Sequence, residues 1–245
     1  LLAMMAVRHG ATKVITCEEV PMIAAKATEI IKANGMAEQI QLINKLSTHL
    51  EVGKDFPERA DILVTEIFDD GLLGERAFLA IEHAIKHLLK PNAQLIPAGV
   101  RVTAVCIESK EIYANHRVDE AAGFDVSAFN QLRVDNYIGY HLSKMNYRAL
   151  SAPKSVFTFD FKKIPGNESI PIEFEGIEAG QCHAIAYWFE LQLDATTTVS
   201  TAPHLPNLSC WRQAVQILEI PQDIVKGRRV AMTAHHDAEG IWFTP

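Results

Sequence analysis

One change in hydrophobic pattern, near residue 98, constrains the fold of this 245-residue chain more than any single motif. Before it, strand-like and helix-like segments alternate along the sequence. The strand-like segments are 14–17, 40–43 and 62–65, and the helix-like segments are 1–9, 21–33 and 75–89. The strand-like segments are short and apolar, which predicts burial on both faces, and the first helix-like segment is apolar enough to predict a buried helix. The alternation predicts a doubly wound α/β domain with a parallel sheet over residues 1–97.

After residue 98, apolar and polar residues alternate with a period of two. The segments with this pattern are 100–106, 155–161, 183–193, 213–218 and 229–233. Turn residues such as Pro165, Gly166 and Asn167 separate them, so they predict a β-barrel or sandwich over residues 98–245. A polar, mixed stretch of weak helical character, about 115–152, interrupts the pattern.

The composition is that of a globular protein and disfavours several classes of partner. Hydrophobic residues make up 48% of the chain and charged residues 22%, which excludes a disordered chain. The formal net charge of −7 argues against nucleic acid as the main ligand. No apolar run approaches the ~20 residues of a membrane helix, so we expect no membrane partner. The four cysteines lie far apart without a CxxC pair, which fits a reducing cytosol and predicts no zinc finger.

Two glutamates flank a glycine-containing loop in the first half of the chain. Glu66 follows the strand-like segment 62–65, and Glu75 opens the next helix-like segment. Ligands of open α/β sheets bind beyond the carboxyl ends of the strands, and Gly71 and Gly74 would let the loop fold back so that the two carboxylates face each other. Two facing carboxylates can hold a guanidinium in charge-assisted hydrogen bonds. The alternative is that Glu75 is a favourable charge in a first helical turn and Glu66 a solvated loop acid.

Other polar residues give weaker signals. Glu18 follows the strand-like segment 14–17, where nucleotide-binding sheets place an acid that accepts hydrogen bonds from ribose hydroxyls. The glycine-rich turn that should precede it is missing from the sequence. His83 and His87 have metal-ligand spacing, but we expect two surface histidines and no metal. For 235–237, a turn at the end of a strand is the expected structure.

Taken with their surroundings, these residues resemble the protein arginine N-methyltransferase family. That family carries Ser/Thr-Glu at a strand end and a second glutamate nine residues later, as Thr65-Glu66 and Glu75 do here. Segment 13–18 is similar to the ribose-binding strand of the family, and 123–127 to the segment before its dimerisation arm. Segments 200–203 and 210–213 resemble its barrel loop near the target arginine. The resemblance runs through nearly the whole chain.

Two branches of the family match best, and they differ in product. Segments 43–48, 66–69 and 234–237 resemble the monomethylating type III branch, whereas 189–194 and Cys210-Trp211 resemble the symmetric dimethylating type II branch. Monomethylation and symmetric dimethylation therefore both stay open. Cys210 stands where the asymmetric enzymes place a histidine, which disfavours asymmetric dimethylation.

The resemblance implies a fold and a set of catalytic and substrate-binding residues. The fold is a Rossmann-like, methyl-donor-binding α/β domain followed by a β-barrel-like domain with a helical dimerisation arm at about 115–152. Glu66 and Glu75 would be catalytic and would need no metal. Asp69 would favour basic substrates, and Trp211 would wall the substrate pocket and limit the number of methyl groups.

The resemblance also implies S-adenosylmethionine as cofactor. Its implied binding residues are Glu18, Leu46, Ser47 and Thr48. Thr48 stands where many members place a glutamate that contacts adenine, so we expect recognition of adenine through the backbone of Leu46 and Ser47. The family's glycine-rich donor loop and helical lid would precede Leu1, so we expect these 245 residues to be part of a longer enzyme.

The implied partners are an arginine-containing, basic protein substrate and a second copy of the chain in a homodimer. We expect the cytosol as the location, with the nucleus left open. The alternative function is a catalytically inactive relative that serves as a binding or dimerisation module. The missing glycine loop favours this alternative, and the presence of both glutamates disfavours it.

Overall fold

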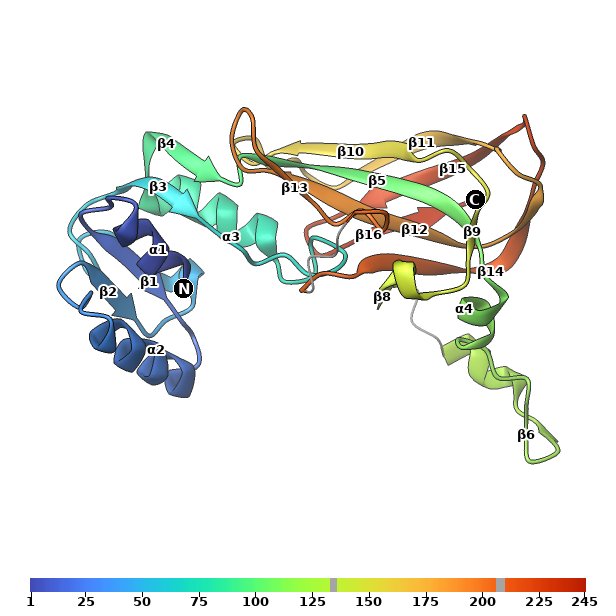
Figure 1. The fold of residues 1–245 in the computed structure, drawn as a ribbon, viewed down its shortest axis with the longest axis horizontal. Helices are drawn as coiled ribbons and strands as arrows, with labels where there is room; N and C mark the ends of the chain where they lie inside the picture. The colour runs from blue at the N-terminus through green and yellow to red at the C-terminus, as the bar shows by residue number, and fades with distance from the viewer. Residues whose placement is uncertain (133–135, 206–209) are drawn as a thin grey trace. The chain divides into compact units, whose positions relative to one another are not determined.

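The computed structural model describes residues 1–132, 136–205 and 210–245 (Figure 1). The chain forms two compact units. The first contains Leu1–Thr65 and Leu79–Ile96, and the second contains Glu66–Phe78 and Pro97–Pro245. The change of pattern near residue 98 falls close to the point where the chain leaves the first unit for the last time, between Ile96 and Pro97. Glu66–Phe78 lies between the two pieces of the first unit in sequence but belongs to the second unit. The sequence pattern does not predict this.

The first unit alternates helices with short parallel strands. In chain order it contains α1 (Leu2–Arg8), β1 (Val14–Cys17), α2 (Pro21–Ala33), β2 (Ile40–Ile43), a 3-10 helix η1 (Ser47–His49), β3 (Ala60–Val64), α3 (Ala77–His83), a π-helical turn η2 (Ala84–Leu88) and β4 (Leu89–Ile96). β1 pairs with β2 and β3 with β4, both in parallel. α2 begins at Pro21, whose missing N–H suits a first turn, and it is followed by Gly35 in the left-handed region (φ 69°).

Two expectations about the first unit need correction. α1, β1 and β3 contain no buried residue, because within the described chain only a few short elements cover them. The helix expected over 75–89 is shorter, and residues 89–96 instead form β4, with Pro91 inside it. β4 has β3 as its partner, so Pro91 sits on an edge strand, where its missing N–H is tolerated.

The second unit is built from antiparallel strands in two sheets. The larger sheet has the order β10-β5-β12-β14-β8, with β13 added to β12 and β9 to β5. Its strands are β5 (Gly99–Glu108), β8 (Ile138–Tyr140), β9 (Arg148–Ala149), β10 (Lys154–Asp160), β12 (Gly180–Gln192), β13 (Thr198–Ser200) and β14 (Gln213–Ile224). The smaller sheet has the order β11-β15-β16, from β11 (Glu168–Glu175), β15 (Arg229–His236) and β16 (Ile241–Thr244). All the period-two segments fall in or within one residue of these strands, whereas β8, β9, β11, β13 and β16 are additional.

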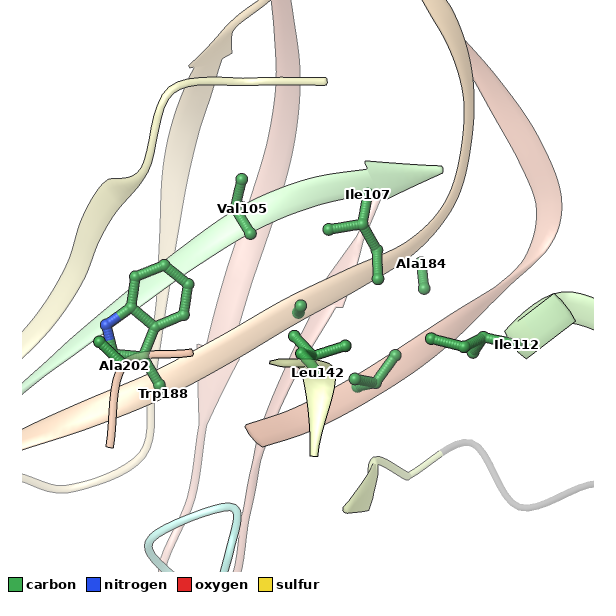
Figure 2. Close-up of a cluster of buried hydrophobic side chains, with 9 residues drawn as sticks. Val105, Ile107, Ile112, Leu142, Ala184, Trp188 and Ala202 are labelled. Carbon is green, nitrogen blue, oxygen red and sulfur yellow. The ribbon is translucent and has the colours of Figure 1, made fainter. Parts of the chain in front are cut away.

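Part of the core of the second unit lies where large and small side chains alternate across β5 and β12 (Figure 2). Ile107 pairs with Ala184 and Val105 with Ala186, so each branched side chain lies beside a methyl group of the neighbouring strand, and all four residues are buried. Ile112, from α4 (Lys110–Ala114), and Leu142, from the 3-10 helix η4 (Leu142–Lys144), complete the cluster.

The segment expected to be a helical arm contains 3-10 helices and a hairpin in its described part. η3 (Ser127–Leu132) and η4 are 3-10 helices, and β6 (Glu120–Ala121) pairs with β7 (Phe124–Asp125). Asn130 binds the backbone N–H and C=O of Val118 at 3.0 and 2.9 Å. Such side chain to backbone bonds compete with an α-helix. Residues 133–135 of the arm lie outside the described residues.

Candidate functional site

Residues 66–76, here called the acidic loop, fold tightly within the second unit. Leu72 and Arg76 adopt the left-handed region, with φ of 78° and 61°, at a cost of roughly 1–2 kcal/mol each for residues with a side chain. Leu72 and Leu73 are fully buried, and the Leu72 N–H donates to the Asp69 carbonyl at 3.0 Å. Phe68 is also buried and stacks on Phe161, with ring centroids 5.7 Å apart. Buried side chains therefore hold the strained backbone of the loop.

The carboxylates of the acidic loop are close enough to affect one another. Partial burial, and then the negative charge of Glu75, raise the pKa of Glu66. Burial, with Asp70 and Glu75 as weaker causes, also raises the pKa of Asp69, against hydrogen bonds from the Gly74 and Gly71 backbone that lower it. The structure thus brings together Glu66, Glu75 and Asp69. Grouped carboxylates with raised pKa values are typical of a site that binds a cation.

Asp69 is engaged on both of its oxygens. Its Oδ1 accepts the Gly74 N–H at 3.0 Å, and its Oδ2 accepts the Tyr137 hydroxyl. These contacts also explain why positions 71 and 74 of the loop are glycines, although neither has a positive φ. A Cβ on Gly74 would lie 2.2 Å from Asp69 Oδ2, and one on Gly71 would lie 2.2 Å from the Tyr137 ring. Close packing, rather than conformational freedom, therefore requires glycine at both positions.

Residues distant in the sequence form hydrogen bonds to the acidic loop. Asp70 accepts the backbone N–H of Arg212 on Oδ1 and its Nε on Oδ2, both at 2.7 Å, and only 12% of the Asp70 side chain is exposed. Trp211 donates its Nε1–H to the Phe68 carbonyl at 2.7 Å and packs edge-to-face on Phe189. The structure therefore places Trp211 against the loop that carries the glutamates. The sequence analysis did not single out Asp70, Arg212 or Tyr137, because no local spacing links them.

The residues expected to bind the cofactor lie in the first unit, at the carboxyl ends of β1 and β2. Because these strands are parallel, Glu18 and the segment after Ile43 emerge at the same edge, and the Glu18 N–H donates to the Ile43 carbonyl at 3.1 Å. Asn44 ties the two segments together through its Nδ2, which donates to the carbonyls of Glu18 and Glu19 at 2.7 and 2.9 Å. Leu46, Ser47 and Thr48 follow in and before η1. The sequence missed the role of Asn44, although a polar residue at a strand end is a usable signal.

The remaining candidates are placed as follows. His235 and His236 are the last residues of β15, and Asp237 begins the turn that was expected there, accepting the Gly240 N–H at 2.9 Å. His83 and His87 lie with ring centroids 4.9 Å apart. Within residues 1–132, 136–205 and 210–245, no three His, Cys, Asp or Glu side chains are grouped so as to hold a metal ion. In the same ranges, no helix is long and apolar enough to span a bilayer.

Comparison with known proteins gives consistent matches. Residues 100–241 match the family model described as the arginine methyltransferase oligomerization subdomain. An arginine N(omega)-methyltransferase of Streptomyces achromogenes subsp. streptozoticus is 35% identical over 235 residues, which cover 95% of this chain and 64% of that protein. Protein arginine N-methyltransferase 7 of Drosophila ananassae is 29% identical over 282 residues, or 99% of this chain and 41% of its own. This chain therefore spans less than two thirds of the length of these relatives.

A solved structure shows the same fold. The Trypanosoma brucei PRMT1 enzyme–prozyme heterotetrameric complex with AdoHcy matches 95% of this chain and 74% of its own, with a TM-score of 0.81 and 22% identity. The match confirms the expectation of a Rossmann-like α/β domain followed by a β-barrel-like domain.

Proposed function

This chain belongs to the arginine methyltransferase family, and from this premise we propose that it transfers a methyl group from S-adenosylmethionine to a guanidino nitrogen of arginine in a protein. The observation that carries the proposal is the pair Glu66 and Glu75 near the two ends of the acidic loop, where burial and then the charge of Glu75 raise the pKa of Glu66. A peptidyl guanidinium is the cation whose geometry fits two carboxylates. The two relatives named above are arginine methyltransferases by name.

The two glutamates would bind and polarise the target. A guanidinium is always protonated at neutral pH and is a poor nucleophile. Glu66 and Glu75 hold two of its nitrogens and draw positive charge toward them, which leaves the third nitrogen with a usable lone pair. Fixing this nitrogen along the line of transfer supplies much of the rate acceleration, of the order of 7–11 kcal/mol in well-oriented systems. Glu66, whose pKa is raised, takes the proton that the methylated nitrogen loses.

The residues of the first unit fit the nucleoside part of the donor. Glu18 accepts the Val20 N–H on Oε1 at 2.8 Å, and a carboxylate has further acceptor sites for a ribose hydroxyl. Leu46, Ser47 and Thr48 would recognise adenine from the neighbouring strand end. S-adenosylmethionine supplies, when bound, an electrophilic methyl group on a sulfonium.

Asp69 and Trp211 would set the choice of substrate and product. The negative charge of Asp69 favours target arginines with basic neighbours. Trp211 is fixed by its bonds to Phe68 and its packing on Phe189, so it presents a rigid wall that limits how many methyl groups the pocket accepts. We propose monomethylation or symmetric dimethylation as the outcome.

The arm would join two copies of the chain in a homodimer. Phe124, Phe129 and Leu132 are 72%, 60% and 76% exposed, and exposed large apolar side chains that lie close together mark interaction surfaces. The family model that covers residues 100–241 is named for oligomerization.

A second candidate function is that of an inactive binding module. The oligomerization match and the prozyme named in the solved relative favour it. The presence of both Glu66 and Glu75 argues against it, since a module that only binds a partner has no need of two adjacent, mutually repelling carboxylates.

The test is methyl transfer to a Gly-Arg-rich peptide by the complete gene product, read by fragmentation mass spectrometry. We expect monomethylarginine or symmetric dimethylarginine. Transfer that is absent across several basic peptides would reject the enzyme and favour the inactive module. Asymmetric dimethylarginine would refute the proposed product while leaving the enzyme class intact.

A further inference from the structure

A cavity in the first unit has no role in the proposed methyl transfer. Its volume is about 620 Å³, within the range of small-molecule sites. One side is formed by residues 48–52, at and after η1, and the other by His83 in α3 and His87 in η2, with Arg59 completing the wall. Only Thr48, at one end, belongs to the segment assigned above to the donor.

The cavity carries a positive charge that no carboxylate neutralises. Arg59 donates Nη1 to the Leu89 carbonyl at 2.7 Å and Nη2 to the Lys86 carbonyl at 3.1 Å. Among the described residues, no Asp or Glu forms an ion pair with it. The lining contains one carboxylate, Glu51, which is paired with Lys54 at 2.9 Å. The guanidinium is therefore held in place by carbonyls, and its charge remains available to a ligand.

Three imidazole rings line the same cavity and can form hydrogen bonds to a ligand there. His49, His83 and His87 line the cavity. The Nδ1 atom of His83 is buried and has no hydrogen-bond partner among the described residues. Burial, and then the neighbouring His87 and His49, lower the pKa of His83. His83 therefore presents the rest of its ring, and not this shielded nitrogen, to a ligand in the cavity.

A metal ion is a poorer occupant than an anion. Among the described residues, these three imidazoles do not form a group that could hold a metal ion. The unneutralised charge of Arg59 would also repel a cation. An anion, in contrast, gains from Arg59 and from each imidazole that takes up a proton.

We propose that this histidine cavity, defined by Thr48, His49, Arg59, His83 and His87, binds a small organic phosphate. A guanidinium fork and imidazole N–H groups are the donors that phosphate oxygens prefer. A phosphate monoester carries about −1.5 to −2 charges at pH 7, which the Arg59 guanidinium offsets in part while the imidazoles supply hydrogen bonds. The volume leaves room for an organic body beside the phosphate.

The test is calorimetric titration of the full chain with glucose 6-phosphate, and with glucose as the phosphate-free control. These ligands carry no adenine, so they do not compete for the donor site. Other charged groups near the cavity are already paired, Glu82 with Lys86 and Asp61 with Lys90.

The matched variants are R59Q and H87Q, with H9Q as the control. Arg59→Gln and His87→Gln should each weaken binding of glucose 6-phosphate at least about tenfold, the effect of removing one charge-assisted hydrogen bond. His9 is exposed in the same unit and does not line the cavity, so His9→Gln should bind as the unchanged chain does. Among the described residues, the His87 side chain forms no hydrogen bond, so H87Q remains informative even if R59Q fails to fold.

Three results would overturn the proposal. Equal binding of glucose and glucose 6-phosphate would exclude phosphate recognition. Unchanged affinity in H87Q, in a chain with an unchanged thermal midpoint, would place the phosphate elsewhere. Binding of Zn²⁺ without binding of glucose 6-phosphate would show a metal site instead.

Discussion

Replacing Glu66 with glutamine should lower activity and leave stability equal or higher, a combination that ordinary damage to the fold does not produce. The substitution keeps the shape of the side chain and one acceptor oxygen, and it removes the negative charge. A bound guanidinium then loses one of its two carboxylate partners, and the NH₂ group of glutamine faces a positive charge. The two effects can be measured separately.

The size of the activity loss follows from Coulomb's law. Two unit charges ~4 Å apart near a protein surface interact by about 4 kcal/mol. Because Glu66 is solvent-exposed, water screens part of this, and we take about 3 kcal/mol. That free energy corresponds to a fall in kcat/KM of roughly one hundredfold.

The stability change has the opposite sign. Partial burial and the Glu75 charge raise the pKa of Glu66 in the folded chain, above the value of ~4.3 in the unfolded chain. The folded state therefore binds more protons, and its stability falls as the pH rises from the unfolded value through the raised folded value. At pH 7 the ionised carboxylate is a cost that Glu66→Gln removes.

The assay pairs peptide methylation by the complete gene product with thermal denaturation at pH 7. Glu175→Gln is the control, since Glu175 is exposed on β11, outside the acidic loop, and neither quantity should change. A Glu66→Gln enzyme that keeps more than a third of the wild-type kcat/KM would refute the guanidinium clamp. A thermal midpoint that falls by several degrees would refute the electrostatic account of the pair.

Three further predictions concern how the acidic loop and the arm are held. Gly74→Ala should cost stability and activity because its Cβ would lie 2.2 Å from a loop carboxylate oxygen, whereas Gly166→Ala, with nothing within 4 Å, should change neither in denaturation and methylation assays. Asp70→Asn should lower the free energy of unfolding by about 1.5–3 kcal/mol in urea titrations, since it weakens two hydrogen bonds to Arg212, and a double-mutant cycle with Arg212→Met should show coupling. Phe129→Asp should convert the proposed homodimer to a monomer in light scattering, and a persistent dimer would exclude the arm as its interface.

The elements that the sequence predicts well are those with their own periodic pattern. β5 and β12 pair over nine positions. The first half of β5 alternates between apolar and polar residues, whereas β12 is a nearly continuous apolar run that is buried from Cys182 to Phe189. β1 and β2 are short apolar runs between recognisable turns, and their parallel pairing follows from the helix between them. In these segments the local pattern predicts the element type, although β1 is not buried as its apolar run predicted.

The elements that the sequence does not predict depend on partners distant along the chain. β4 contains Pro91 and becomes a strand only through its pairing with β3. The acidic loop is held by hydrogen bonds that span about 140 residues, from Trp211 to Phe68 and from Arg212 to Asp70. No window of neighbouring residues contains that information, so spacing identified the glutamates but not what positions them.

These hydrogen bonds between residues distant in sequence stabilise the conformation of the acidic loop. Burial and the charge of Glu75 raise the pKa values of Glu66 and Asp69, and two residues of the loop adopt left-handed backbone, so the loop alone would relax and separate its charges. Burial of Leu72 and Leu73, the Arg212–Asp70 pair and the Trp211–Phe68 bond oppose that relaxation. The second unit thus holds the carboxylates together before any cation arrives, and a guanidinium that binds there relieves their repulsion without paying to assemble them.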